Sequence, residues 1–126
     1  MSAGLKKHTE TARGKRILGK SLTRYVRCAP RKVRLVVDLI RGKAAGDALI
    51  ILQFTQRPSA VPYVTRALKA AIASAKEVHP EPETLLVSEA IVDEAPMMKR
   101  TRPASMGRAV RVRKRQSHIF LALAES

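Results

Sequence analysis

Three segments of the chain repeat apolar residues at the spacing of one helical face. The pattern predicts helices over about 30–41, 44–54 and 59–78. Pro30 suits the first position of the first helix, where its missing N–H is not needed. Ser59 is expected to cap the third helix, and the alanines that follow favour helix and close helix packing. Each predicted helix therefore has an apolar stripe to bury.

Other segments alternate apolar and polar residues, as half-buried strands do. They are Leu22–Cys28, Thr84–Asp93 and a last run over about 110–123. The apolar residues of the second segment change faces near Glu89, which indicates either a β-bulge there or a strand that is partly covered on both faces. The stretch 96–107 is expected to be a long segment between strands, and loops of that length in small domains are usually functional or disordered.

The segment between Pro96 and Arg115 carries the strongest charge pattern of the chain. It holds many cationic residues and no acid. Such a segment repels itself and gains little by folding onto a core, so we expect a polyanion to order it. A two-stranded hairpin alone in water is only marginally stable. We therefore interpret it as an arm that RNA orders. Its cations are Lys99, Arg100, Arg102, Arg108, Arg111, Arg113, Lys114 and Arg115.

Composition agrees with one small nucleic-acid-binding domain. The 126 residues are 45% hydrophobic, which is enough for one modest core. The formal net charge is +15, with positive charge concentrated toward both ends of the chain. Nucleic acid is the favoured partner, and no membrane association is expected. Aromatic residues are only 3%, so base-stacking platforms are not expected.

The pattern also divides the chain. Residues 1–21 are basic and polar, and we interpret them as a flexible N-terminal tail. Residues 22–126 are expected to form a single RNA-binding domain that includes an extended hairpin over 84–124. Cys28 is the only cysteine, so no internal disulfide forms and a reducing cytoplasm fits. No secretory signal or membrane-spanning run is recognised.

Catalytic and metal chemistry have little support. The three histidines, His8, His79 and His118, are scattered and lack metal-ligand spacing. No serine or cysteine lies in a nucleophile motif, and no glycine-rich phosphate loop is present. Asp93 and Glu94 are adjacent, so on a strand they point to opposite faces and cannot work as a pair. The chain is therefore not expected to be an enzyme or to need a cofactor.

Three motifs in order are more specific than the charge. They are R-Y-V-R-C-A-P-R-K-V-R-L-V-V-D-L-I-R-G-K at Arg24–Lys43, V-D-E-A-P-M-M-K-R-T-R-P-A-S-M-G-R-A at Val92–Ala109, and K-R-Q-S-H-I at Lys114–Ile119. Over roughly Thr23–Ala124 the chain resembles the family of large ribosomal subunit protein number twenty-two of bacteria and organelles. The resemblance implies an α+β fold, with three helices packed on a small antiparallel three-stranded sheet and a long basic β-hairpin extension.

The resemblance also implies roles for individual residues. The partners would be large-subunit rRNA, neighbouring large-subunit proteins and the nascent peptide, on a cytoplasmic or organellar ribosome. The rRNA contacts would be Arg24, Arg27, Arg31, Lys32, Arg34, Arg41 and Lys43 from the body, and Arg108, Arg111, Arg113, Lys114, Arg115, Ser117 and His118 along the hairpin. The hairpin tip, lining the peptide exit tunnel, would be Met98, Lys99, Arg100, Thr101, Arg102 and Pro103.

The chain departs from the family pattern at two places, and the sequence leaves one alternative function open. Ala29 stands before Pro30 where the family usually has Ser, so the first helix should lack a side-chain N-cap. Ala104 and Met106 occupy positions that are often basic in the family, which weakens the tip's expected rRNA contacts. The alternative function is a free-standing nucleic-acid-binding or RNA-chaperone protein, which would explain the charge but not the ordered motifs.

Overall fold

The computed structural model describes residues 17–103 and 105–125, apart from the side chains of Met98, Arg100 and residues 110–113. Residues 1–16, which make up most of the predicted tail, lie outside this part. The elements in chain order are β1 (Ile17–Val26), α2 (Pro30–Ile40), α3 (Ala45–Phe54), α4 (Val61–Lys76), η1 (Pro82–Thr84), β2 (Leu86–Pro103), η2 (Ser105–Gly107) and β3 (Ala109–Ala124).

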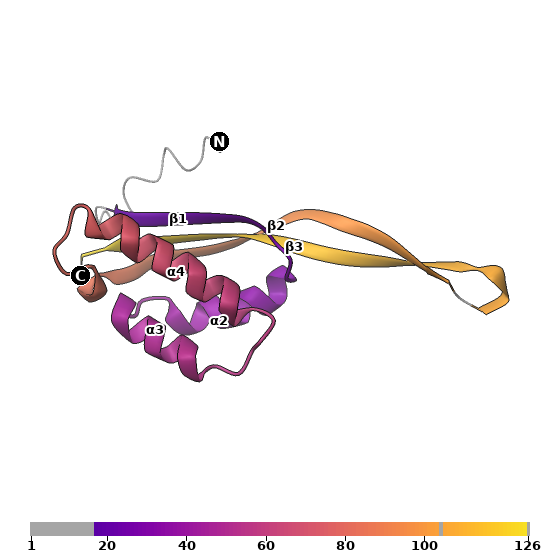
Figure 1. Ribbon diagram of the computed structural model, residues 1–126, viewed down its shortest axis with the longest axis horizontal. Coiled ribbons are helices and arrows are strands. Elements are labelled where there is room, and N and C mark those ends of the chain that lie inside the picture. Colours follow the sequence, from indigo (N-terminus) through magenta and orange to yellow (C-terminus); the bar gives the residue numbers. More distant parts are fainter. Residues whose placement is uncertain (1–16, 104, 126) are drawn as a thin grey trace.

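The three helices gather beside an antiparallel sheet with strand order β1-β3-β2 (Figure 1). The predicted α+β class is confirmed. The first strand begins at Ile17 rather than at Leu22, so residues 17–21 belong to the sheet and not to the tail. The sequence missed this extension because Gly19, Lys20 and Ser21 look like linker residues, whereas their backbones pair with the end of β3.

The core is built from small and branched aliphatic side chains. The apolar stripe of α2 and the consecutive residues at the end of β3, represented by Val36 and Leu121, are buried. Burying a side chain of this size contributes about 1.5–3 kcal/mol each. Gly19 lets α4 approach β1 closely, because a Cβ at this position would lie 2.5 Å from the Cβ of Ala75 and 2.6 Å from the carbonyl oxygen of Ala71.

Two predictions about helix starts have different outcomes. No side chain caps α2, as the alanine at position 29 predicted. The prediction that Ser59 caps α4 is wrong. The N-cap of α4 is Ala60, and the N–H groups of Ala60 and Val61 donate to the carbonyl of Arg57 instead. A backbone turn thus replaces the side-chain cap that the sequence favoured.

The free edge of β2 is covered by the end of α2 and the segment that follows. Gly42, at a φ of 79°, donates its N–H to the carbonyl of Val87, and the Val87 N–H donates to the Lys43 carbonyl. The Ala45 N–H donates to the Leu85 carbonyl. These bonds satisfy backbone groups that an edge strand would otherwise expose.

Beyond the body, β2 and β3 continue as a two-stranded arm that runs away from the helices (Figure 1). The pairing extends from Ala95 opposite Gln116 to Pro103 opposite Ala109. The expectation of a long segment between strands over 96–107 is therefore wrong for 96–103, because β2 continues to Pro103 and the described part of the turn contains Ser105–Gly107. The sequence did not indicate this strand, because two adjacent methionines and then consecutive polar residues give no alternation of apolar and polar positions.

Two bulges set the path of β2. One lies between Val87 and Glu89, as the change of faces predicted. The other lies between Ala95 and Met98, where β2 has one residue more than β3. Pro96 lies in this second bulge, which suits a residue with no N–H to give to a ladder. The arm thus leaves the body at an irregular point of the strand pair.

Candidate nucleic-acid interface

The first cationic group surrounds the connection from β1 to α2. Arg24, Arg27, Arg31 and Lys32 are all exposed. The last two lie in the first turn of α2, which contains no acid and has no side-chain cap. Cations are unfavourable at the positive end of a helix dipole, whereas an anion there is stabilised. This end of α2 is therefore suited to meet phosphate.

The second cationic group follows the arm. Every arm residue from Pro96 to Arg115 whose side chain is described is exposed. The register places Lys99 directly opposite Arg113, and like charges across a strand pair are destabilising. The described side chains of the arm therefore form no core, and the arm gathers charge that a polyanion would neutralise. The described cations are Lys99, Arg102, Arg108, Lys114 and Arg115, while the side chains of Arg111 and Arg113 lie outside the described ones.

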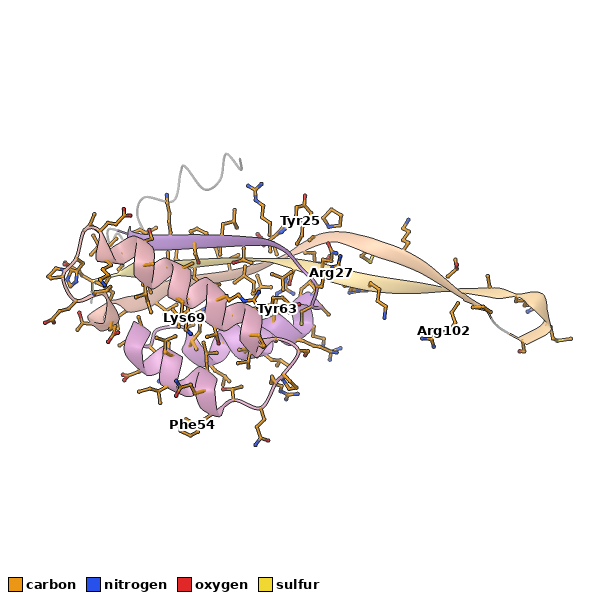
Figure 2. All side chains as sticks on the ribbon, in the orientation of Figure 1. Tyr25, Arg27, Phe54, Tyr63, Lys69 and Arg102 are labelled. Atoms are coloured by element: carbon orange, nitrogen blue, oxygen red, sulfur yellow. The ribbon has the colours of Figure 1, made fainter. Side chains whose placement is uncertain are left out.

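The two cationic groups meet at the root of the arm. β1 ends where Val26 pairs with Ser117, one residue from the start of the two-stranded part. A pocket of about 140 Å³ there is lined by both Pro30 of α2 and Arg115 of β3. Glu94 also lines this pocket. Figure 2 shows Arg27 near this root and Arg102 far out on the arm. The fold thus brings two separate sequence motifs to the same end of the body, and the two cationic groups together are called the basic surface.

Two of the predicted rRNA-binding arginines are held by the protein itself. The Arg34 side chain donates from Nε and Nη2 to the Val92 carbonyl, at 3.3 and 2.9 Å. Arg41 donates from Nη2 to the Ala90 carbonyl at 2.6 Å and pairs through Nη1 with Asp38 at 2.5 Å. Both cap carbonyls on β2, a role that sequence reasoning missed. The remaining predicted body cation, Lys43, is exposed.

The side chain of Ser117 is buried and does not lie on the candidate interface. Its side chain is fully buried, and its hydroxyl donates to the Cys28 carbonyl at 3.0 Å. The side chain thus ties β3 to the β1–α2 connection and has no open surface in this structure, while the predicted rRNA contact of Ser117 stays a prediction. The neighbouring His118 is partly exposed, and its Nδ1 accepts the backbone N–H of Tyr25 at 3.1 Å.

The predicted tip residues lie on β2 rather than at the turn. Lys99, Thr101, Arg102 and Pro103 are exposed on the outer part of the arm, and the side chains of Met98 and Arg100 lie outside the described ones. The turn itself contains Met106, with a φ of 64° and 95% exposure. Met106 is therefore the most exposed large apolar side chain of the described part.

Acidic residues gather at the other end of the body. Glu77, Glu81 and Glu83 lie around the end of α4 and η1, and His79 Nε2 is 3.7 Å from a carboxylate oxygen of Glu125. Within residues 17–103 and 105–125, no group of histidine, cysteine and acidic residues is placed to hold a metal ion. The helices of this part are all too short or too polar to cross a membrane.

The comparisons with known proteins agree with these features. The family model "Ribosomal protein L22p/L17e" matches residues 21–124. The chain is 50% identical over 107 residues to the large ribosomal subunit protein uL22 of Desulfitobacterium hafniense (strain Y51), covering 84% of this chain and 93% of that protein. It is also 50% identical over 107 residues to uL22 of Oceanobacillus iheyensis, covering 84% of this chain and 94% of the relative. The chain therefore belongs to the ribosomal protein L22p/L17e family and is a structural, non-enzymatic protein of the large ribosomal subunit.

Proposed function

We propose that the chain binds large-subunit rRNA through the basic surface and uses the outer arm to line the peptide exit tunnel. One observation carries the proposal: a paired arm, whose described side chains are all exposed, holds eight cations and no acid between Pro96 and Arg115. Each neutralised phosphate releases condensed counterions, and that release drives association. RNA segments that converge on the arm would be stabilised against their mutual repulsion.

The arm is suited to a narrow space. It is only two strands wide, and its turn exposes Met106. A flexible thioether adapts to varied apolar neighbours, as a surface that meets changing nascent peptides requires. The residues proposed to line the tunnel wall are Met98, Lys99, Arg100, Thr101, Arg102 and Pro103, with the turn beyond them.

Neighbouring large-subunit proteins are the remaining proposed partners. Leu35 and Leu39 on α2, and Ile50 and Phe54 on α3, are about half or more exposed. Apolar side chains at such spacing on adjacent helices favour a protein contact over an RNA contact. The proposed location is the ribosome, in the cytoplasm or in an organelle.

The experiment is a salt titration of binding to large-subunit rRNA by filter retention. The plot of log affinity against log salt should be steep and linear. Replacing Lys114 and Arg115 by Ala should flatten the slope by about one for each phosphate that the variant no longer neutralises. Lys69 and Lys76, exposed cations of α4, provide the matched control, and their double Ala variant should keep the slope.

Two results would contradict the proposal. The slope of the Lys114/Arg115 variant could equal that of the intact chain, in which case the arm makes no phosphate contact there. Equal affinity for rRNA and duplex DNA, with the protein absent from large subunits in a sucrose gradient at high salt, would favour the free-standing nucleic-acid-binding protein instead.

A further inference from the structure

Tyr25 has an unusual backbone conformation at the root of the arm. Its φ is 55°, in the left-handed region that bulky side chains rarely adopt. β1 pairs through Thr23 with Ile119 and through Val26 with Ser117, so Tyr25 belongs to a bulge in the strand. Such conformations persist only where the surroundings enforce them, and they occur often at functional sites. The conformation of Tyr25 therefore makes this bulge a candidate functional site.

His118 fixes the ring of Tyr25 in place. The Tyr25 N–H donates to His118 Nδ1 at 3.1 Å. The two rings meet nearly perpendicular, with centroids 5.0 Å apart and an angle of 84° between the planes. An edge-to-face contact is a favoured aromatic geometry. The ring is thus oriented by one strand while it projects from another.

The oriented ring is still open to solvent. Tyr25 is 60% exposed, and Figure 2 shows it near the root of the arm. The neighbouring residues Arg24 and Arg27 are exposed cations. Phe54, an exposed aromatic on α3, has an ordinary φ and no aromatic partner among the described residues, so exposure alone does not bring these restraints. The combination at Tyr25 is that of a stacking surface set between phosphate-binding groups.

We propose that Tyr25 is a platform on which an unpaired RNA base stacks while Arg24 and Arg27 bind the flanking phosphates. The inference rests on the proposed rRNA binding and names the ligand at this one place, a nucleotide outside a duplex. It departs from the interpretation of the composition, by which base-stacking platforms are not expected, because one oriented ring is enough for one base.

The test compares short oligoadenylate with an abasic oligonucleotide of the same length and charge, each titrated with the full chain at low salt. Replacing Tyr25 by Leu should weaken binding of oligoadenylate about tenfold and leave the abasic strand unaffected. Tyr25→Phe keeps the ring and should bind like the intact chain. Phe54→Leu removes an exposed ring away from the basic surface and should change neither affinity. Equal melting temperatures would show that the variants are folded.

A second variant reports stacking directly. The chain contains no tryptophan, so Tyr25→Trp supplies a single indole at the site. Oligoadenylate should quench its fluorescence, and the abasic strand should not. If both strands bind while quenching is absent and Tyr25→Leu binds normally, the site binds phosphate only and the stacking proposal is overturned while rRNA binding stands. If neither strand nor large-subunit rRNA binds, the proposed function fails first and the platform with it.

Discussion

The body and the arm share the strand pair β2–β3 but are stabilised in different ways. In the body, β3 residues such as Leu121 and Leu123 are fully buried under the helices. In the arm, the same strand has exposed side chains at Ala109, Lys114 and Arg115. Backbone pairing is continuous across the boundary, apart from the bulge at Pro96. Strand pairing alone thus does not distinguish a region that folds by itself from one that depends on a partner.

The two regions differ in whether their side chains are buried. Burial of apolar surface compensates the body for the entropy lost on folding. The described side chains of the arm give no such compensation, and the repulsion between its cations adds to the cost. Binding of RNA would remove that repulsion and give the arm a surface to lie on. The body is then the stable anchor, and the arm is the part that the partner orders.

The largest expected effect follows from removing the arm. Ala95 and Gln116 are paired, so an Asn-Gly turn between them would close a short hairpin after residues 96–115 are deleted. The body keeps its whole core, and its melting temperature should change little. Affinity for large-subunit rRNA should fall on the order of 10³ at moderate salt, because the deletion removes eight cations.

Calorimetry and filter binding measure the two effects separately. A deletion variant that melts far below the intact chain would show that the arm helps to fold the body. That result would contradict the contrast between a body that is stable by itself and an arm that depends on a partner. Retained affinity with a retained salt slope would instead place the RNA contacts on the body alone.

The next effect concerns the body only. Gly19→Ala adds a methyl group within 3 Å of Ala75 and of the carbonyl of Ala71, and backbone atoms cannot yield easily. The change should lower the free energy of unfolding by about 2 kcal/mol, as overpacking of a tight core does. Urea denaturation measures it. The rRNA salt slope of the folded variant should not change.

Gly46→Ala is the matched control for Gly19→Ala. Its new Cβ would lie 3.6 Å from Glu83, an ordinary contact, and Gly46 is inside α3. Alanine in a helix should therefore stabilise the protein by about 0.5–1 kcal/mol. Equal effects at the two glycines would contradict the close approach of α4 to β1.

The sequence predicts some elements of the body and of the arm and misses others. Apolar periodicity located the three helices and the bulge near Glu89, because burial leaves a regular pattern. It failed at Gly19–Ser21 and along 96–103, where pairing partners, not local composition, make the strand. In the candidate interface the exposed cations were predictable from charge. The buried Ser117 was not, since its position depends on where β1 ends against β3.

The smallest expected effects concern Arg34 and Arg31, two cations of α2 that are expected to have different roles. Arg34 donates two hydrogen bonds to the Val92 carbonyl, whereas Arg31 is exposed in the first turn. Arg34→Ala should lower the free energy of unfolding by about 1 kcal/mol, because a carbonyl on the edge of β2 loses its donor and the site is partly open to water. Arg31→Ala should leave stability unchanged or slightly raised, since a cation leaves the positive end of the helix.

Binding should show the reverse order for the same two variants. Arg31→Ala should reduce the rRNA salt slope by about one, as expected when one phosphate is no longer neutralised. Arg34→Ala should affect the slope less, because its guanidinium already serves β2. Urea denaturation of the two variants measures the change in the free energy of unfolding, and filter binding measures the change in the salt slope. If both variants show an equal decrease in stability and in slope, the cations of α2 act as one set, and the boundary between folding and binding residues does not run through this helix.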